Sequence, residues 1–370
     1  MRDNCFESLE HQNNEETEKK LQEIRKNSET GHRVKFYFAP MEGITGYTLR
    51  NVHHACYPGM DAYFTPFIAP NQHHAVNPKE HRDVVQENNQ GIPLIPQVLT
   101  NKAELFLWSA RELKEKYGYT EVNLNLGCPS KTVVSKRKGS GFLEDTEKLN
   151  RFFDEVFSTV EAASSQSEPG EPENLYPRIS VKTRLGMHEV DEFADILQVY
   201  NQYPLSELII HARVQKEFYK GEPHLEVFAD AVKESKLSLC YNGDIWQLSD
   251  YQRIRNLFPT VNKVMIGRGM LANPELVQEL RSYEACLATG GEWSGHQDSM
   301  VKLKQFHDRL LDGYLLQMNG DGNNVLFKMK ELWSFLGRQF PEQEKLVKKM
   351  IKANKLGEYE KLAGQLLANI

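Results

Sequence analysis

Cys128 is the residue of this sequence whose surroundings point most directly to chemistry. It follows the alternating run EVNLNL at 121–126, lies between Gly127 and Pro129, and precedes a basic loop that ends in glycines. The alternation predicts a short strand, and α/β enzymes keep their reactive groups at the ends of such strands. A cysteine that serves packing would more often lie within the strand. We therefore expect a strand that carries the Cys128 thiol to an exposed tip.

Polar residues end the other apolar runs, and their types suit a flavin nucleotide. Gln97 and Asn125 offer the donors and acceptors that a pyrimidine-like ring edge requires, and Lys182 can stabilise negative charge on a ring. Glycines after the last two runs, with Arg268, can hold a phosphate through backbone N–H groups. Such polar residues are costly in apolar strands unless something binds them, and a large polar ligand such as FMN would remove that cost. The strand-end set is Gln97, Asn125, Lys182, Arg184, His211, Arg213, Asn242, Gly243, Asp244, Gly267, Arg268 and Gly269.

Short β-branched or aromatic runs alternate with helix-length segments along the chain. Eight such units over about 250 residues predict a (β/α)8 TIM barrel, an α/β fold in which all strand ends meet at one mouth. A doubly wound open sheet is the alternative, but no GxGxxG turn follows the first run. The expected strands are 34–39, 61–65, 93–98, 121–126, 179–184, 206–211, 237–242 and 262–267. The expected helices between and after them are 46–57, 101–117, 145–163, 190–203, 225–235, 248–258 and 274–288.

The remaining segments divide the chain into parts. Residues 1–33 are polar and predict a flexible N-terminal arm, while 34–289 hold the barrel that would bind FMN. The serine-, glutamate- and proline-rich stretch 164–177 predicts a surface insertion. Residues 296–370 show only helical apolar stripes, which predict a small bundle of four helices.

Composition excludes several classes of protein. The five cysteines are scattered without a CxxC pair, so we expect neither disulfides nor a cysteine zinc site, and a reducing cytoplasmic location. No apolar stretch is long enough for a membrane span, and residues 1–33 lack a signal-peptide core. Adjacent His pairs, without HxH or HExxH spacing, argue against a bound metal, and no GxSxG elbow suggests a serine hydrolase.

The net charge of -6 argues mildly against a nucleic-acid partner. However, residues 296–370 contain 12 basic and 9 acidic side chains, so this part is positive on an otherwise negative chain. Five lysines between 345 and 355 recur at helical spacings and predict one basic face. A solvated helix and a track for RNA phosphates are both compatible with this pattern.

These residues resemble the tRNA-dihydrouridine synthase family. The likeness covers about 36–288, and the helical tail resembles the family's C-terminal tRNA-binding domain. The most specific motif is the one around the cysteine, with the thiol eleven residues ahead of Gly139. The motifs that carry the resemblance are APMEGIT at 39–45 with Arg50, the Gln97 strand, NLGCPSKTVVSKRKGSGFL at 125–143, VKTRLG at 181–186, HARVQKEFYKG at 211–221, YNGDI at 241–245 and MIGRGMLANP at 265–274.

The resemblance implies a role for each matching residue. Gln97 and Lys182 would contact the flavin ring, His211 would help to hold the cofactor, and Cys128 would be the proton donor. Others would meet the flavin or its phosphate: Pro40, Met41, Glu42, Asn125, Asn242, Gly243, Asp244, Gly267 and Arg268. The implied reaction reduces the C5–C6 bond of a uridine in tRNA. NADPH would reduce FMN, hydride would pass to C6, and Cys128 would protonate C5. We expect a monomer.

The substrate uridine must leave its stack in the folded tRNA, so the enzyme also needs contacts with the RNA backbone. Candidates for these contacts are Lys131, Arg137, Lys138, Lys348, Lys349 and Lys352. Three departures from the family pattern concern the substrate side: Gly46 replaces an acid, Gln215 replaces an arginine, and His224-Leu225 replace an acidic-Trp pair. Two alternatives stay open, namely another FMN barrel that acts on a free pyrimidine and a non-catalytic RNA-binding protein.

Overall fold

The fold is described from a computed structural model of the chain. The described residues are 33–165, 175–291, 293–296 and 299–368. The arm expected at 1–33, apart from Arg33, and most of the insertion expected at 164–177 lie outside these ranges.

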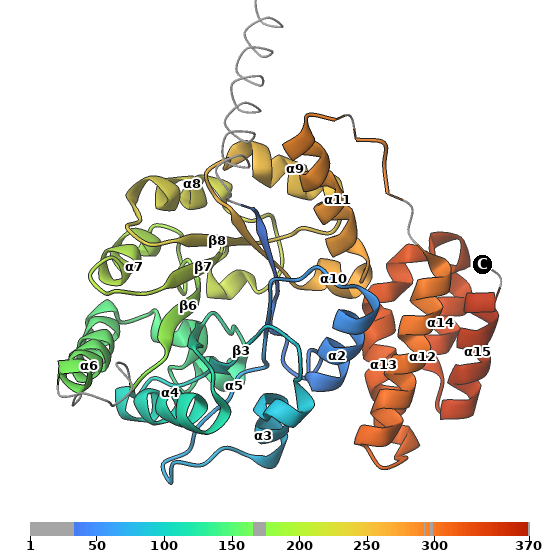
Figure 1. The fold of residues 1–370 in the computed structure, drawn as a ribbon, viewed down its shortest axis with the longest axis horizontal. Coiled ribbons are helices and arrows are strands. Elements are labelled where there is room, and N and C mark those ends of the chain that lie inside the picture. The colour runs from blue at the N-terminus through green and yellow to red at the C-terminus, as the bar shows by residue number, and fades with distance from the viewer. Residues whose placement is uncertain (1–32, 166–174, 292, 297–298, 369–370) are drawn as a thin grey trace, which may run out of the picture.

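A sheet of parallel strands forms a nearly closed barrel at the centre of the molecule (Figure 1). The predicted third strand is divided at Pro96, which has no N–H to donate to a strand ladder. Its first half pairs with the strand before it and its second half with the strand after it, so the two ends of the sheet meet at Pro96. All eight predicted strands are confirmed, with the third in two parts, and so is the TIM-barrel fold class. The strands are β1 Lys35–Phe38, β2 Ala62–Phe64, β3 Leu94–Ile95, β4 Gln97–Val98, β5 Glu121–Leu126, β6 Arg178–Arg184, β7 Glu207–His211, β8 Leu239–Asn242 and β9 Lys263–Ile266.

Helices surround this barrel, and the seven predicted segments are confirmed with shifts of a few residues at their ends. Three further helices were not predicted: the short α5 and α10, and α3. The signal for α3 is local: Asn77 and Glu80 form a capping box, and Pro78 occupies the first turn. The helices around the barrel are α2 Tyr47–Cys56, α3 Pro78–Val84, α4 Ala103–Tyr117, α5 Lys131–Val134, α6 Thr146–Ser165, α7 Glu192–Tyr200, α8 Leu225–Glu234, α9 Leu248–Leu257, α10 Arg268–Ala272 and α11 Leu276–Thr289.

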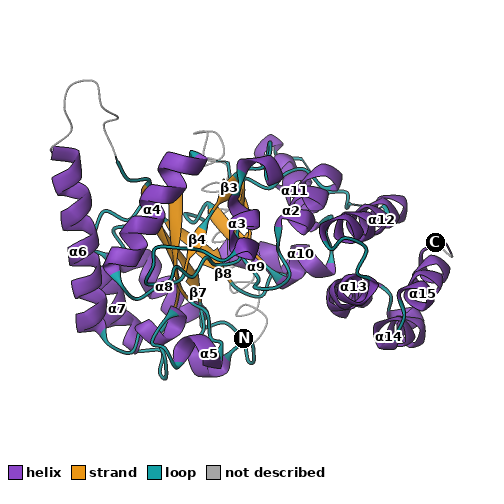
Figure 2. Cartoon of the chain, turned by 90° about the horizontal axis from the view of Figure 1, so that it is seen from below, coloured by secondary structure: helices purple, strands orange, loops and turns teal. Residues whose placement is uncertain are grey.

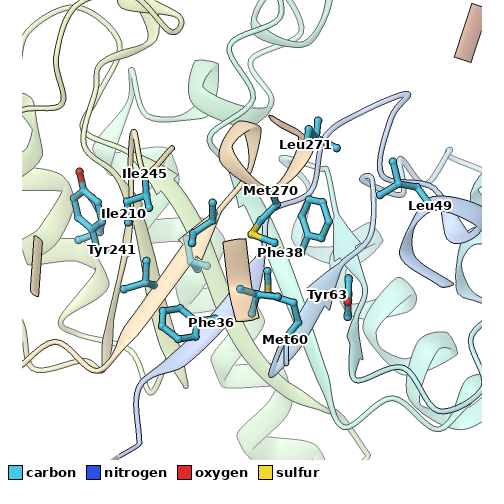
Figure 3. Close-up of a cluster of buried hydrophobic side chains, with 14 of the residues drawn as sticks. Phe36, Phe38, Leu49, Met60, Tyr63, Ile210, Tyr241, Ile245, Met270 and Leu271 are labelled. Carbon is cyan, nitrogen blue, oxygen red and sulfur yellow. The ribbon is translucent and has the colours of Figure 1, made fainter. Parts of the chain in front are cut away.

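Alternate residues of β1, β2, β7, β8 and β9 enter different hydrophobic clusters, because successive side chains of a strand point to opposite faces. Phe36 and Phe38 of β1 belong to a large cluster that includes helix residues such as Leu49. Tyr37, between them, packs instead with Ile209 and other strand residues. Figure 3 shows Phe36 and Phe38 in the first cluster. These strands therefore have an apolar layer on both sides, whereas the alternate residues of β5 and β6, such as Asn123 and Lys182, are polar.

Four helices follow the barrel, as predicted, and lie to one side of it (Figure 2). They are α12 Met300–Gln317, α13 Gly322–Leu336, α14 Glu344–Lys352 and α15 Leu356–Ala368. Polar contacts join them to the barrel: Thr48 Oγ1 of α2 donates to Gln317 Oε1 at 2.7 Å, and Gln339 Nε2 donates to the Ala272 carbonyl at 2.6 Å. Among the described residues, no helix is both long and apolar enough to span a membrane.

Candidate functional site

Two adjoining pockets lie at the carboxyl ends of the barrel strands. The larger has a volume of about 320 Å³ and contains the Cys128 loop, while the smaller, about 60 Å³, lies beyond the ends of β8 and β9. They share Pro40, Met41, Lys182, His211 and Tyr219, so they form one elongated site. The larger pocket adds the predicted residues Glu42, Gln97, Asn125 and Cys128, and the smaller adds Asn242, Gly243, Asp244, Gly267 and Arg268. The structure thus brings together every predicted cofactor-contacting residue.

A larger cavity of about 460 Å³ lies outside this mouth, between the first turns of α4 and α6. Side chains of both signs line it, including Lys102, Glu104, Arg137 and Glu144. Its volume alone does not make it the active site, because reactive groups of a barrel enzyme come from the strand ends. We therefore place the chemistry in the elongated site.

The loop around Cys128 is held by hydrogen bonds at both of its ends. Asn125 Oδ1 accepts the backbone N–H groups of Gly127 at 3.1 Å and Cys128 at 2.9 Å. The Cys128 carbonyl accepts the Ser140 hydroxyl at 2.9 Å and the Ser140 backbone N–H at 3.2 Å. These bonds fix the backbone that carries the thiol. Burial raises the pKa of Cys128, and the nearby cations Arg184 and Lys182 oppose this only in part, so the thiol stays protonated at neutral pH.

Gln97 and Asn125 belong to a buried row of polar side chains that bond to one another. Asn125 Nδ2 donates to Gln97 Oε1 at 2.6 Å, Gln97 Nε2 donates to Asn123 Oδ1 at 2.8 Å, and Asn123 Nδ2 donates to Ser180 Oγ at 3.0 Å. The expectation that these residues need a ligand to offset their burial is therefore wrong, because the row satisfies itself. The amide nitrogens of Gln97 and Asn125, which line the larger pocket, each still have a second hydrogen for a ligand.

Lys182 and His211 stand side by side at the shared part of the site, and burial shifts both pKa values downward. The pKa of Lys182 falls to about 8, first through burial and then through the charge of Arg184. Burial and the neighbouring cations hold the pKa of His211 well below its ordinary value, so its ring is neutral. Arg213 Nη1 lies 3.2 Å from His211 Nε2. Because arginine can only donate, the proton of the neutral ring is on Nδ1.

Three charged side chains form the end of the site near β8 and β9. The Asp244 carboxylate lies between Arg213 and Arg268 and forms an ion pair with each. Two guanidinium groups share one carboxylate, so these three side chains together carry a net positive charge at the small pocket. The backbone here is closely packed, since a Cβ at Gly269 would collide with the Ile245 carbonyl. Asp244 itself would repel a phosphate, so we assign it the task of holding Arg268.

The arrangement fits the flavin that the resemblance implies. Amide and aliphatic groups line the larger pocket, and at the smaller pocket a Cβ placed on Gly267 would have Ala39 Cβ at 3.3 Å and Met41 Sδ at 3.5 Å. Cationic Arg268 lies at the far end, where a phosphate would be. The donors therefore match both the ring and the phosphate of FMN.

Tyr219 and Arg184 line the site but were not among the flavin contacts that the resemblance implied, although Arg184 belongs to the strand-end set. Tyr219 is half exposed and borders both pockets. Arg184 is buried, and its guanidinium donates to the carbonyls of Gly127 at 2.9 Å, Val214 at 3.0 Å and Phe218 at 2.7 Å. Arg184 thus joins the cysteine loop to the loop after β7. Both residues lie within quoted motifs, but residue type alone does not reveal which loops they join.

The three departures from the family pattern have local partners. Gln215 Nε2 donates to the Pro129 carbonyl at 3.0 Å, beside Cys128, and His224 Nε2 lies 2.8 Å from Glu217 Oε1. At the start of α2, next to Gly46, Asp83 Oδ1 accepts the Tyr47 N–H at 2.7 Å. Gln215 therefore supports the cysteine loop in this structure.

The predicted RNA contacts fall into two separate groups. Lys131 begins α5, and Arg137 and Lys138 follow that helix. Asn101 Nδ2 donates to the Arg137 carbonyl at 3.0 Å, and Arg137 lines the 460 Å³ cavity. Lys348, Lys349 and Lys352 are exposed on α14, and Figures 1 and 2 place α14 far to one side of α5. Lys348 pairs with Glu344 at 2.6 Å, and Lys355 lies beyond the end of α14. The basic face of α14 is thus smaller than the lysine run suggested.

Comparison with known proteins gives a consistent result. A family model described as dihydrouridine synthase matches residues 37–359. The tRNA-dihydrouridine(16) synthase of Aquipseudomonas alcaligenes is 27% identical over 259 residues, covering 68% of this chain and 76% of that protein. A probable tRNA-dihydrouridine synthase of Staphylococcus aureus (strain COL) is 31% identical over 252 residues, covering 65% and 69%. Histamine dehydrogenase from Rhizobium sp. 4-9 shares the fold alone, with 12% identity, a TM-score of 0.50, and coverage of 68% of this chain and 46% of that chain.

Proposed function

The chain belongs to the dihydrouridine synthase family, and we propose that it reduces the C5–C6 double bond of a uridine in tRNA with Cys128 as the proton donor. The observation that carries this proposal is the position of a protonated, partly buried thiol in the same pocket as Lys182, Gln97 and Asn125. A thiol that stays protonated at neutral pH is suited to donate a proton rather than to attack as a nucleophile.

The residues that would hold FMN follow from the two pockets. Gln97, Asn125 and Lys182 would contact the ring, and Arg268, held by Asp244, would contact the phosphate. Pro40 and Met41 would cover the ring between these ends. When bound and reduced by NADPH, the flavin supplies the hydride that C6 accepts.

The chain's own part of the reaction is proton delivery and alignment. Cys128 gives its proton to C5 as C6 becomes saturated, and the thiolate that remains takes a proton from water before the next cycle. Lys182 and Arg184, the cations near the thiol, stabilise that thiolate while it exists. The His211 ring is neutral with its proton on Nδ1, because Arg213 Nη1 donates to Nε2.

The RNA contacts are a separate part of the proposal. A uridine reaches a recessed pocket only after it leaves the base stack, so the surrounding backbone must be bound as well. Lys131 follows Ser130 at the larger pocket, which supports it as the contact nearest to the flipped nucleotide. Arg137, which lines the 460 Å³ cavity, and the next residue, Lys138, would meet the RNA backbone farther out. Lys349 and Lys352 would meet phosphates farther along the tRNA.

The test replaces the thiol in the intact chain. Cys128→Ala is expected to retain yellow, flavin-bound protein and to form little dihydrouridine, measured by mass analysis of tRNA nucleosides with the modified position mapped. Cys286→Ala is the matched control, since that thiol is also partly exposed but lies in α11, away from the site. Full activity of Cys128→Ala would remove the proton-donor assignment.

A further inference from the structure

Five side chains form an alternating series of cations and aromatic rings that leads from the cysteine loop to the helical domain. The Arg184 guanidinium lies 5.3 Å from the Tyr219 ring centre, and Arg268 lies 4.9 Å from the same ring. Arg268 is also 4.9 Å from the Trp246 ring, which Arg338 approaches to 4.0 Å. Each distance is within the range of cation–π attraction. One continuous chain of contacts therefore joins the pocket to Arg338.

The middle of this series is rigidly supported. The Trp246 backbone N–H donates to Asp250 Oδ2 of α9 at 2.9 Å, so the ring projects from an anchored turn. Arg268 begins α10, which packs so closely against the turn after β8 that residue 269 must be glycine. Arg268 also pairs with Asp244. Its guanidinium is thus held in place by one carboxylate and two rings.

Arg338 comes from the other domain. It lies in the short 3-10 helix η4 Gly337–Gln339, directly after α13. The next residue, Gln339, donates to the Ala272 carbonyl at the end of α10, and Lys328 of α13 donates to the Gly43 carbonyl beside Glu42. Figures 1 and 2 show α10 on the side of the barrel that faces α13. The helical domain therefore contacts the segments on both sides of the proposed cofactor site.

Arg338 is exposed, and no ion pair involves it in the part of the chain that the structure describes. An exposed arginine normally points into water, where its guanidinium is fully hydrated. Here it lies over the ring of Trp246, and that ring contacts the cation at the phosphate end of the site. The Arg338 guanidinium restricts the orientation of the Trp246 ring, and that ring restricts the position of the Arg268 guanidinium.

We propose that Arg338 is a positioning residue for the cofactor phosphate, acting through Trp246 on Arg268, so that the helical domain contributes to FMN affinity as well as to RNA binding. This inference rests on the proposed function, since it takes FMN as the cofactor. It assigns the domain a second task, because a cation from α13–η4 helps to hold the group that meets the phosphate.

The test measures binding of FMN and of riboflavin, which lacks the phosphate, to the flavin-free full-length chain by fluorescence titration. One cation–π contact corresponds to an affinity change of about two- to fivefold, so Arg338→Ala is expected to weaken FMN binding by about that factor. Arg338→Lys should restore part of the loss. Trp246→Leu, which removes both ring contacts, should weaken FMN binding about tenfold. Riboflavin binding should stay unchanged in all three variants.

Arg82→Ala is the matched control, because Arg82 is an exposed arginine of α3, far from the phosphate end of the site, and FMN binding should stay unchanged. Thermal unfolding of each flavin-free variant verifies that it is folded. Arg338→Ala in the Trp246→Leu background should add no further loss if the effect passes through the ring.

The outcomes separate this inference from the function on which it rests. An unaltered chain that binds no FMN contradicts the proposed function itself. If that chain binds FMN and Arg338→Ala binds it equally well, the positioning role is refuted. Equal losses for FMN and riboflavin would also refute it, since they would indicate general loosening of the pocket. Additive losses in the double variant would refute the path through Trp246.

Discussion

Gly139 is the residue at which the geometry of the cysteine loop can be tested most directly. Its φ is +56°, in the left-handed region, and a Cβ placed on it would lie 2.8 Å from the Cys128 carbonyl oxygen and 3.0 Å from Cys128 Cβ. The same carbonyl accepts both hydrogen bonds from Ser140. Gly139→Ala therefore forces either strain in the loop or displacement of Cys128.

The expected loss of stability in Gly139→Ala has two parts. An alanine in the left-handed region costs about 1–2 kcal/mol. Overpacking against a fixed neighbour adds about 1–3 kcal/mol, and here the neighbour is backbone that cannot rotate away. We expect the free energy of unfolding to fall by about 2–5 kcal/mol in total. Dihydrouridine formation should fall too, because relaxation of the clash moves the thiol.

Gly118→Ala isolates the cost of placing an alanine in the left-handed backbone region. Gly118 ends α4 with φ +75°, and no atom lies within 4 Å of the place of its Cβ. Urea unfolding of the full-length chain should therefore show a loss of only about 1–2 kcal/mol for Gly118→Ala. The alkylation rate of Cys128 should change in Gly139→Ala alone. Equal stability losses in the two variants, with an unchanged Cys128 rate, would refute the reasoning.

Two further predictions concern charge. The pKa of Lys182 is about 8 in the folded chain and 10.5 ordinarily, so the buried ammonium destabilises the flavin-free fold below pH 8, and this cost declines as the pH rises from 8 toward 10.5. Lys182→Met should thus raise the free energy of unfolding at pH 7 by up to about 3 kcal/mol, and by less at pH 9.5. Urea titrations at the two pH values measure this difference. A stabilisation that grows with pH would contradict the reasoning. Neutralising Lys348, Lys349 and Lys352 together should weaken tRNA binding and reduce the slope of log affinity against log salt by up to about 3, with Lys348, already paired with Glu344, contributing least. Unchanged affinity at low and high salt would identify α14 as an ordinary solvated helix.

Local patterns account for most of the predicted fold. Short β-branched or aromatic runs between helix-length segments located every strand, because strands buried on both faces are apolar nearly throughout. The pattern did not predict that the third strand divides at Pro96. That division depends on which neighbouring strands β3 and β4 pair with. The pattern also failed at α3, a seven-residue helix without an apolar stripe, for which the capping box at Asn77 was the available signal.

The candidate site was predictable in its members and less so in their interactions. The strand-end rule selected Gln97, Asn125, Lys182 and His211, since parallel strands of a barrel deliver their ends to one mouth. It did not show that Gln97 and Asn125 satisfy each other, which requires the register of neighbouring strands. It also did not show that Asp244 pairs with both Arg213 and Arg268, because these two arginines come from different loops.

The sequence by itself determined the cysteine loop: the strand before it, Gly127 and Pro129 at its start, and the glycines that end it. These are properties of residues close together in the chain, so composition and spacing specify them. Only the tertiary structure decided the thiol's pKa, the tautomer of His211 and the contact between Arg338 and Trp246. Each depends on burial and on charges contributed by distant segments, which sequence spacing does not encode.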